Sequence, residues 1–251
     1  LLAMACSCYK KLGIDIYIEW NNRKFLSGII TYCQIEEELV SDVILAVDKL
    51  AKIGEDGVRA ELKEKIKDNS KLDKLFSYFK LSLEELKEKF KDVANDNLRA
   101  GINEVIELND YLLELDLKEC IFTPYLARGL EIYTGTVWEV FDKQKRVTCS
   151  IGAGGRYDKI ITNFLADGNE YPAIGMTFGL VPIYEILTQT ENQKLNLYDL
   201  YLIPMETNIK TLDLARKIRD KGIKVIVEMN ARKIKKCFEW ANKNNIPYVS
   251  V

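Results

Sequence analysis

The spacing of hydrophobic and polar residues predicts an opening segment that combines helix and strand. Residues 1–13 have apolar positions at helical spacing and end at Gly13, a residue typical of a helix C-terminus. A short strand is predicted by the alternation in IDIYIEW, residues 14–20. Residues 21–33 then read as a turn that leads into a second helix. The opening segment is therefore expected to be α plus β.

From about residue 54 to residue 118 the pattern becomes helical. Charges of both signs surround Leu, Ile and Phe residues at intervals of three and four, as in DKLFSYFKLSLEELKEKF. Ser82 and Glu85 have the spacing of a capping box, which predicts a helix that begins there. The charges are typical of solvated helix faces, and the alternative is a docking surface for a long partner. We expect a small helical subdomain.

After Cys120 the apolar period returns to two. Consecutive antiparallel strands are predicted in VWEVF and RVTCSIGAGG, which are joined by the polar turn DKQK. The pattern then predicts a helix over residues 156–165 and a strand over residues 172–178. It also predicts a second helix over residues 179–187, with Pro182 in its first turn.

The last part of the chain alternates strand and helix. Strands are predicted in LYDLYLIPM, KVIVEM and IPYVSV, with helices over residues 211–221 and 232–244 between them. This alternation is typical of a parallel α/β unit. The chain stops inside the last of these strands.

Composition narrows the class of protein but does not identify a function. With 251 residues, 47% of them hydrophobic, the chain can bury a core and is expected to form two or three domains. The formal charge of −2 excludes a global basic field, so any nucleic-acid contact must come from a local patch. The six cysteines show neither a zinc spacing nor a disulfide framework, which indicates reduced thiols in a cytosol and no metal site. No apolar run is long enough to span a bilayer, so a cytoplasmic protein without a membrane partner is expected.

Candidate chemistry is concentrated in residues 126–141, LARGLEIYTGTVWEVF. Read as one continuous strand, this stretch has an unusually polar face, and Arg128 stands at its beginning. Because Gly135 would let a ligand lie close to the backbone, the set suits a small polar molecule with negative charge. The alternative is a half-exposed structural strand with an ordinary surface arginine. The polar face would consist of Glu131, Tyr133, Gly135, Val137 and Glu139, and the other face of Leu130, Ile132, Thr134, Thr136 and Trp138.

Glycines also precede Arg156 and Tyr157 in GAGGRYD, residues 152–158. Their spacing matches neither the dinucleotide-binding fingerprint nor the P-loop. A glycine-lined strand that approaches a planar ligand fits the pattern better.

Taken together and in order, these segments resemble the histidyl-tRNA synthetases. The histidine-specific loop and strand of that family resemble LARGLEIYTGTVWEVF, and its glycine-rich strand and class II motif 3 strand resemble IGAGGRYDKI and PAIGMTFGL. The segment after motif 2 resembles NNRKFLSGI and AVDKLAKIG, and the start of the anticodon-binding domain resembles DLYLIPM and GIKVIVEMNARKIKKCFEWANKNNIPYV. Four linked segments in the family's order are more specific than any single motif, and they cover essentially the whole chain.

The resemblance implies an α+β fold with the class II synthetase antiparallel sheet, a helical insertion that grips tRNA, and a truncated α/β anticodon-binding domain. The implied reaction is the activation of histidine by ATP, with Mg²⁺ accompanying the nucleotide, followed by transfer of the histidyl group to tRNA. The intact protein would be a homodimer. Since motifs 1 and 2 of the family would precede Leu1, the chain is expected to be a fragment that is inactive alone. The implied domains are the catalytic core at 1–53 and 119–190, the insertion at 54–118, and the N-terminal part of the anticodon-binding domain at 195–251.

The resemblance also assigns roles to individual residues. Arg128 matches the arginine that stabilises negative charge on the α-phosphorus during adenylation. Tyr133 matches the tyrosine whose hydroxyl meets the imidazole of the substrate, a contact that would reject apolar isosteres. The site for histidine and its adenylate is expected to comprise Ile132, Tyr133, Gly155, Tyr157 and Gly175.

The chain departs from the family pattern at three places. Glu131 and Ile132 stand where many relatives have aspartate and tyrosine, and both changes are mild. In motif 3, Val181 and Pro182 replace the usual glutamate and arginine, so the arginine that holds the ATP γ-phosphate is missing.

A cluster of cations in the last unit is the candidate tRNA contact. Lys224 leads one predicted strand, and further cations stand at the start of the next helix of an otherwise acidic chain. The alternative is that these side chains only keep the surface soluble while Ile234 and Phe238 pack inward. The candidate tRNA-binding residues are Lys224, Arg232, Lys233 and Lys236.

Two other functions remain open at this stage. One is a non-catalytic synthetase paralogue, such as the regulatory subunit of ATP phosphoribosyltransferase, against which the terminal β/α unit argues because that subunit lacks an anticodon domain. The other is an RNA- or protein-binding module without chemistry, which the absent motif 3 arginine favours.

Overall fold

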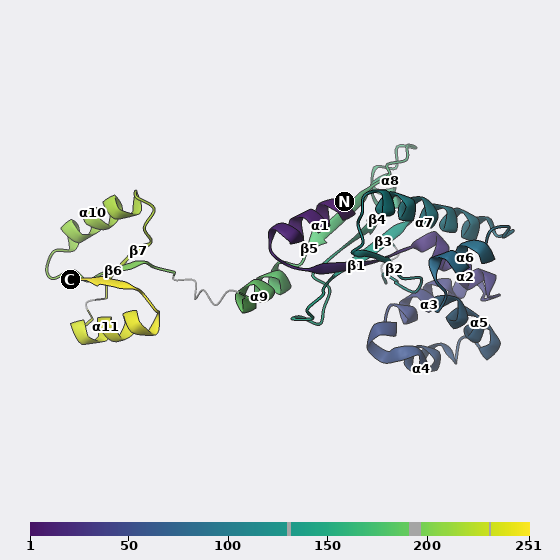
Figure 1. Cartoon of the computed structure of the whole chain (residues 1–251), viewed down its shortest axis with the longest axis horizontal. Helices are drawn as coiled ribbons and strands as arrows, with labels where there is room; N and C mark the ends of the chain where they lie inside the picture. Colours follow the sequence, from purple (N-terminus) through teal and green to yellow (C-terminus); the bar gives the residue numbers. More distant parts are fainter. Residues whose placement is uncertain (130–131, 191–196, 231) are drawn as a thin grey trace. The chain divides into compact units, whose positions relative to one another are not determined.

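The computed structural model describes residues 1–129, 132–190, 197–230 and 232–251 (Figure 1). The chain forms two compact units, Leu1–Ile186 and Leu187–Val251, and each is described by itself. The expected boundary between the catalytic core and the last domain falls on residues 191–196, which lie outside the described residues. The division of the first unit into core and insertion stays a prediction.

A five-stranded sheet forms the centre of the first unit. Its strand order is β2-β1-β3-β4-β5, and every neighbouring pair is antiparallel except β1 and β2. The α+β class with a mostly antiparallel sheet is thus confirmed, as is the predicted hairpin of β3 and β4. The strands are β1 (Ile16–Asn22), β2 (Cys120–Phe122), β3 (Thr136–Asp142), β4 (Gly152–Arg156) and β5 (Ile174–Phe178).

One face of this sheet is covered by α1 (Leu2–Lys11). The Tyr9 hydroxyl donates a hydrogen bond of 2.6 Å to the carbonyl oxygen of Ile151, and its ring lies 5.4 Å from that of Phe178. Trp20 and Trp138, neighbours in the β1–β3 register, are buried on the same face. Because α1 and the tryptophans fill this face, the opposite face is the one left for a site.

Six α-helices of the first unit gather toward one end of the sheet (Figure 1). The capping box of Ser82 and Glu85 is confirmed at the start of α6. The helices α2 and α7 pack closely because a Cβ atom on Gly101 would lie only 2.2 Å from the backbone nitrogen of Phe25. These helices are α2 (Arg23–Tyr32), α3 (Val40–Val47), α4 (Leu50–Leu62), α5 (Asn69–Phe79), α6 (Leu83–Lys89) and α7 (Asp96–Glu114); a short 3₁₀ helix, η1 (Glu37–Leu39), precedes α3.

The prediction of one continuous strand over residues 126–141 was wrong. β3 begins only at Thr136, so Ile132, Tyr133, Thr134 and Gly135 do not share strand faces, and Leu130 and Glu131 lie outside the described residues. The physical reason is the loss of a partner strand. The β1–β3 ladder ends at the pair Asn22 and Thr136, because the chain turns into α2 at the next residue. The second predicted strand is likewise shortened to β4, and residues 146–151 form the connection to it.

The elements α8 (Lys159–Leu165) and α9 (Leu180–Thr190) follow β4 and β5, with Pro182 in the first turn of α9 as predicted. The second unit confirms the parallel α/β pattern. Its strands pair in the order β7-β6-β8, both pairs parallel. Tyr201, Cys237 and Ala241 are buried in its core. The elements are β6 (Leu200–Leu202), α10 (Asn208–Arg219), β7 (Val225–Val227), α11 (Ile234–Lys243) and β8 (Tyr248–Ser250).

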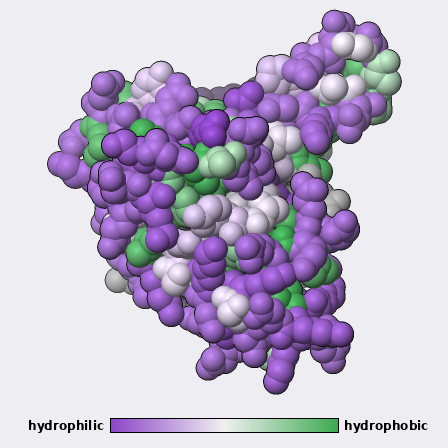
Figure 2. Space-filling view, turned by 90° about the vertical axis from the view of Figure 1, so that its right-hand side faces the viewer, coloured by the Kyte–Doolittle hydropathy of each residue, from purple (hydrophilic) through white to green (hydrophobic). Residues whose placement is uncertain are grey.

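The surface is predominantly polar where the space-filling view shows it. Hydrophilic residues cover most of that face, and a band of hydrophobic and intermediate residues interrupts them (Figure 2). None of the helices in the described part of the chain combines the length and the apolar character needed to cross a membrane.

Candidate functional site

The sheet face opposite α1 carries two neighbouring rows of residues, contributed by four strands. Glu19 of β1 stands beside Glu139 of β3, and Val137 of β3 stands beside Gly155 of β4. Gly155 is in turn paired with Gly175 of β5. Two carboxylates in one row and two glycines in the next give the face a charged part and a part without side chains of its own.

Two tyrosines lie over the two glycines. A Cβ atom on Gly155 would be 2.6 Å from the Tyr133 ring, and a Cβ atom on Gly175 would be 2.4 Å from the Tyr157 hydroxyl. Real side chains do not approach that closely, so only glycine allows each tyrosine to lie against its strand. The structure therefore brings together four of the residues that the sequence assigned to one site. The two glycines thus let both tyrosines pack closely on the same part of the sheet.

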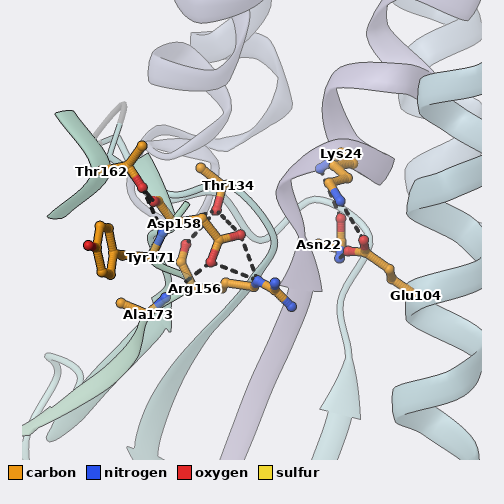
Figure 3. A network of polar contacts seen from close by, with 9 residues as sticks. All are labelled: Asn22, Lys24, Glu104, Thr134, Arg156, Asp158, Thr162, Tyr171 and Ala173. Carbon is orange, nitrogen blue, oxygen red and sulfur yellow. Dashed lines mark hydrogen bonds and ion pairs between the residues drawn. The ribbon is translucent and has the colours of Figure 1, made fainter. Parts of the chain in front are cut away.

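The backbone beside both tyrosines is held by a polar network centred on Asp158 (Figure 3). The Thr134 backbone nitrogen donates to the Arg156 carbonyl oxygen at 2.8 Å, and the Asp158 carboxylate accepts from the Thr134 hydroxyl at 3.2 Å. Arg156 Nε donates to the same carboxylate at 2.7 Å, and the Ala173 backbone nitrogen at 3.2 Å. Although burial opposes it, these contacts lower the pKa of Asp158. A carboxylate that stays charged can hold the residues that flank Tyr133 and Tyr157.

A second network fixes the corner where β1 becomes α2 (Figure 3). The Asn22 side chain caps α2 by accepting from the backbone nitrogens of Lys24 and Phe25. It also donates to Glu104 of α7 at 2.7 Å, and Lys24 pairs with the same carboxylate. This corner matters for the site, since Arg23, the next residue, donates from its guanidinium to the Arg128 carbonyl oxygen at 3.2 Å.

Arg128 lies beside the row that holds the two carboxylates. Its guanidinium forms an ion pair of 2.6 Å with Glu139 and lies 5.7 Å from the centre of the Tyr133 ring. A shallow cavity of about 290 Å³ opens here, lined by Asp48, Arg128, Gly129 and Glu139. Burial raises the pKa of Glu139 although the Arg128 charge opposes it, and burial likewise raises the pKa of Asp48. The cavity is thus lined by two carboxyl groups, those of Asp48 and Glu139, and by the guanidinium of Arg128.

Sequence reasoning placed Glu139 on a polar face but missed two acids beside it. A signal for Glu19 was present, because the alternation of IDIYIEW puts it on the face opposite Ile18 and Trp20. No local signal could have found Asp48, since it follows the end of α3 and reaches Arg128 only through the packing of that helix.

Other candidate residues of the first unit contribute less. Ile132 directs its side chain outward, with 38% of its surface exposed. At the motif 3 position, Val181 is exposed and Pro182 supplies no charge, so no cation stands there. Within the described residues, no group of three or more His, Cys, Asp or Glu side chains is arranged to hold a metal ion.

The four candidate cations of the second unit have different surroundings. The Arg232 guanidinium lies 3.7 Å from the Glu228 carboxylate and 5.4 Å from the centre of the Trp240 ring. Lys233 and Lys236 are exposed at the start of α11, and the Lys224 backbone nitrogen is bound to Asp199. A hollow of about 570 Å³, lined in part by Met205, Glu228, Met229, Arg232 and Lys233, adjoins them.

Comparisons with known proteins identify the family of the chain. The family model of histidyl-tRNA synthetase matches residues 1–183. A histidine–tRNA ligase 1 of Bacillus cereus is 42% identical over the whole chain, and a histidine–tRNA ligase of Clostridium tetani is 32% identical over 96% of it. The chain spans 59% and 57% of the length of these relatives.

Solved structures show the same fold. A crystal structure of histidyl-tRNA synthetase from Nostoc sp. PCC 7120 is 26% identical, with a TM-score of 0.76 over the full chain and 61% of that protein. A Bacillus halodurans structure described as an ATP phosphoribosyltransferase regulatory subunit/histidyl-tRNA synthetase covers 99% of the chain with a TM-score of 0.69 at 17% identity. This second match extends over the C-terminal unit and shows the same fold there.

Proposed function

The chain belongs to the histidyl-tRNA synthetase family, and from this premise we propose that the full-length protein is a histidine–tRNA ligase. It would activate histidine with ATP and then transfer the histidyl group to tRNA. The observation that carries the proposal is the position of Arg128, Tyr133 and Tyr157 on one sheet face, with both rings over glycine.

The proposed first step joins a carboxylate oxygen of histidine to the α-phosphorus of ATP as pyrophosphate leaves. Negative charge grows on the phosphoryl oxygens in the transition state, so a guanidinium fixed beside them stabilises that state more than the ground state. Arg128 has five N–H donors, and the contact with Glu139 occupies only part of them. In the proposed role, the remaining donors bind the phosphoryl oxygens. The Tyr133 hydroxyl would bind the imidazole of the substrate.

ATP is proposed as a substrate, accompanied by Mg²⁺. Because Val181 and Pro182 supply no guanidinium for the γ-phosphate, other groups would bind that end of the nucleotide. By analogy with the family, we also propose that the full-length protein is a cytoplasmic homodimer.

Histidine-dependent exchange of pyrophosphate into ATP by the full-length protein tests the proposal. Tyr133→Phe should raise the Michaelis constant for histidine about 2- to 10-fold, because one lost hydrogen bond to a buried group costs about 0.5–1.5 kcal/mol. The turnover number should change less. Tyr171→Phe, which removes an exposed hydroxyl bound to Asp167, is the matched control. If Tyr133→Phe leaves histidine affinity unchanged, this tyrosine serves only in packing.

For the second unit we propose contact with tRNA phosphates through Arg232, Lys233 and Lys236. Changing all three to glutamine should weaken tRNA binding and reduce the slope of log affinity against log salt by about 2, because fewer counterions are released. Pyrophosphate exchange should stay nearly unchanged. The measurement is a filter-binding titration at several salt concentrations.

A control with the same change in charge uses Lys210, Arg216 and Lys217 of α10, each changed to glutamine. An equal loss of slope in both triple variants would show that general charge, and not this cluster, attracts the RNA. Because Arg232 also contacts the buried Glu228, the double variant of Lys233 and Lys236 checks that the effect does not come from a disturbed fold.

The second candidate function is that of a non-catalytic paralogue, which the uncharged motif 3 position favours. The fold shared with the Bacillus halodurans structure is compatible with it. Such a protein would show no histidine-dependent exchange at any concentration of ATP. The same assay therefore decides between the two functions.

A further inference from the structure

The loop that carries Arg128 is held at several points by elements far away in the sequence. The buried Asn21 side chain donates to the carbonyl oxygens of Pro124 and Leu126, each at 2.9 Å. Arg23 holds the Arg128 carbonyl oxygen, as described above. From the other side, the Asp48 carboxylate lies against Gly129, since a Cβ atom on that glycine would be 3.3 Å from an Asp48 carboxylate oxygen. The backbone of residues 124–129 is therefore fixed from β1 and from the end of α3.

The guanidinium itself is fixed by a strand. Glu139 lies in the middle of β3, paired with β1 on one side and with β4 on the other. The carboxylate and the guanidinium are both largely withdrawn from solvent, with 24% and 22% of their side-chain surfaces exposed. An ion pair between a sheet strand and a supported loop leaves the guanidinium little freedom of orientation.

From this arrangement we infer that Glu139 is a positioning residue for adenylation: it directs the Arg128 guanidinium at the reacting phosphate, while Asp48 holds the loop that carries it. The inference rests on the proposed function. Glu139 does not touch substrate in this role. It acts through Arg128, since a charged group misplaced by about 1 Å can lose much of its effect on the rate.

Glu139 is surrounded by both acidic and basic side chains. Glu19 stands directly opposite Glu139 on β1. Two like charges in that position destabilise the strand pair unless a cation lies nearby. Asp48 adds a further negative charge, and Lys52 and Arg128 are the positive ones that act on Glu139. The Arg128 guanidinium is therefore the neighbour that most favours the charged form of Glu139.

The test compares Glu139→Gln and Glu139→Asp with the wild type in histidine-dependent pyrophosphate exchange by the full-length protein. Glu139→Gln should lower kcat about 10- to 100-fold, with the KM for histidine changed less than about twofold. Glu139→Asp keeps the charge and should recover part of the rate. Asp48→Asn should lower kcat in the same sense, by a smaller factor. The control is Glu55→Gln, which breaks a glutamate–arginine pair of similar exposure with Arg59.

Unchanged kcat in Glu139→Gln, or a loss no larger than in Glu55→Gln, would overturn the inference. If Glu139→Gln does not fold, as judged by circular dichroism, Glu139→Asp and Asp48→Asn decide: a lower kcat with unchanged KM supports the inference, and wild-type kcat in both overturns it. A wild-type protein without any exchange would instead overturn the proposed function, and the inference with it.

Discussion

Replacing Arg128 with alanine in the full-length protein is expected to lower the rate of histidine-dependent pyrophosphate exchange about 10²- to 10³-fold. This is the usual cost of removing one preorganised group that stabilises charge in the transition state. Histidine binding should weaken far less, because the charge that Arg128 meets develops only as the phosphorus is attacked. The measurement is steady-state exchange, with histidine affinity determined separately by equilibrium titration.

Arg128→Lys separates charge from geometry. Lysine keeps the positive charge but lacks the planar fork that can bind Glu139 and a phosphoryl oxygen together. We therefore expect it to recover only a minor part of the lost rate. Exchange at the wild-type rate in Arg128→Ala would refute the proposed role, and full recovery by lysine would show that the planar fork of the guanidinium is dispensable.

Asp142→Asn is expected to destabilise the first unit by about 3 kcal/mol. The Asp142 side chain is fully buried and accepts from the Arg146 backbone nitrogen at 2.9 Å and from its guanidinium at 2.7 Å and 2.9 Å. Breaking a buried pair costs about 3–5 kcal/mol, and the lower end applies because Arg146 lies in a turn from which it can reach water. Urea unfolding at neutral pH measures the change.

The same carboxylate predicts a dependence on pH. The hydrogen bonds from Arg146 lower the pKa of Asp142 below its ordinary value near 3.8. Because the folded pKa lies below the unfolded one, the stabilisation is complete above the unfolded pKa and is lost as the pH falls through the folded pKa. Asp142→Asn should lack this part of the acid sensitivity. Asp116→Asn, which removes an exposed pair with Lys118, should cost less than about 1 kcal/mol. A comparable loss in both variants would contradict the assignment.

Local patterns predicted the elements whose ends are fixed by local chemistry. Ser82 begins α6 through its own capping box, and Gly13, which follows α1, has a φ of +70° that glycine tolerates. The stretch before Thr136 was predicted as strand because its residues favour strands. Its actual conformation depends on where β1 ends, and that is decided by the Asn22 cap of α2, far away in the sequence. The strand preference of these residues therefore could not show that β3 begins only at Thr136.

The candidate site was predictable to the extent that its residues lie near one another in the sequence or match a family pattern. The family pattern alone predicts five of its residues, namely Arg128, Tyr133, Gly155, Tyr157 and Gly175. The supports of Arg128 were not, because Asn21, Arg23 and Asp48 reach it through contacts between distant segments. A residue whose role is to support another residue from a distant segment has no local sequence motif that would identify it.

The packing of tyrosine on glycine also constrains the order in which this protein can change over generations. Any residue other than glycine at position 155 would collide with the Tyr133 ring, whereas a smaller residue at position 133 would collide with nothing at Gly155. Losing the tyrosine first removes the closest contact, although the Thr136 carbonyl oxygen would still lie 3.0 Å from a Cβ atom at position 155, whereas the opposite order passes through an intermediate in which the Tyr133 ring is displaced. Among related sequences, we therefore expect Gly155 to be retained more often than Tyr133.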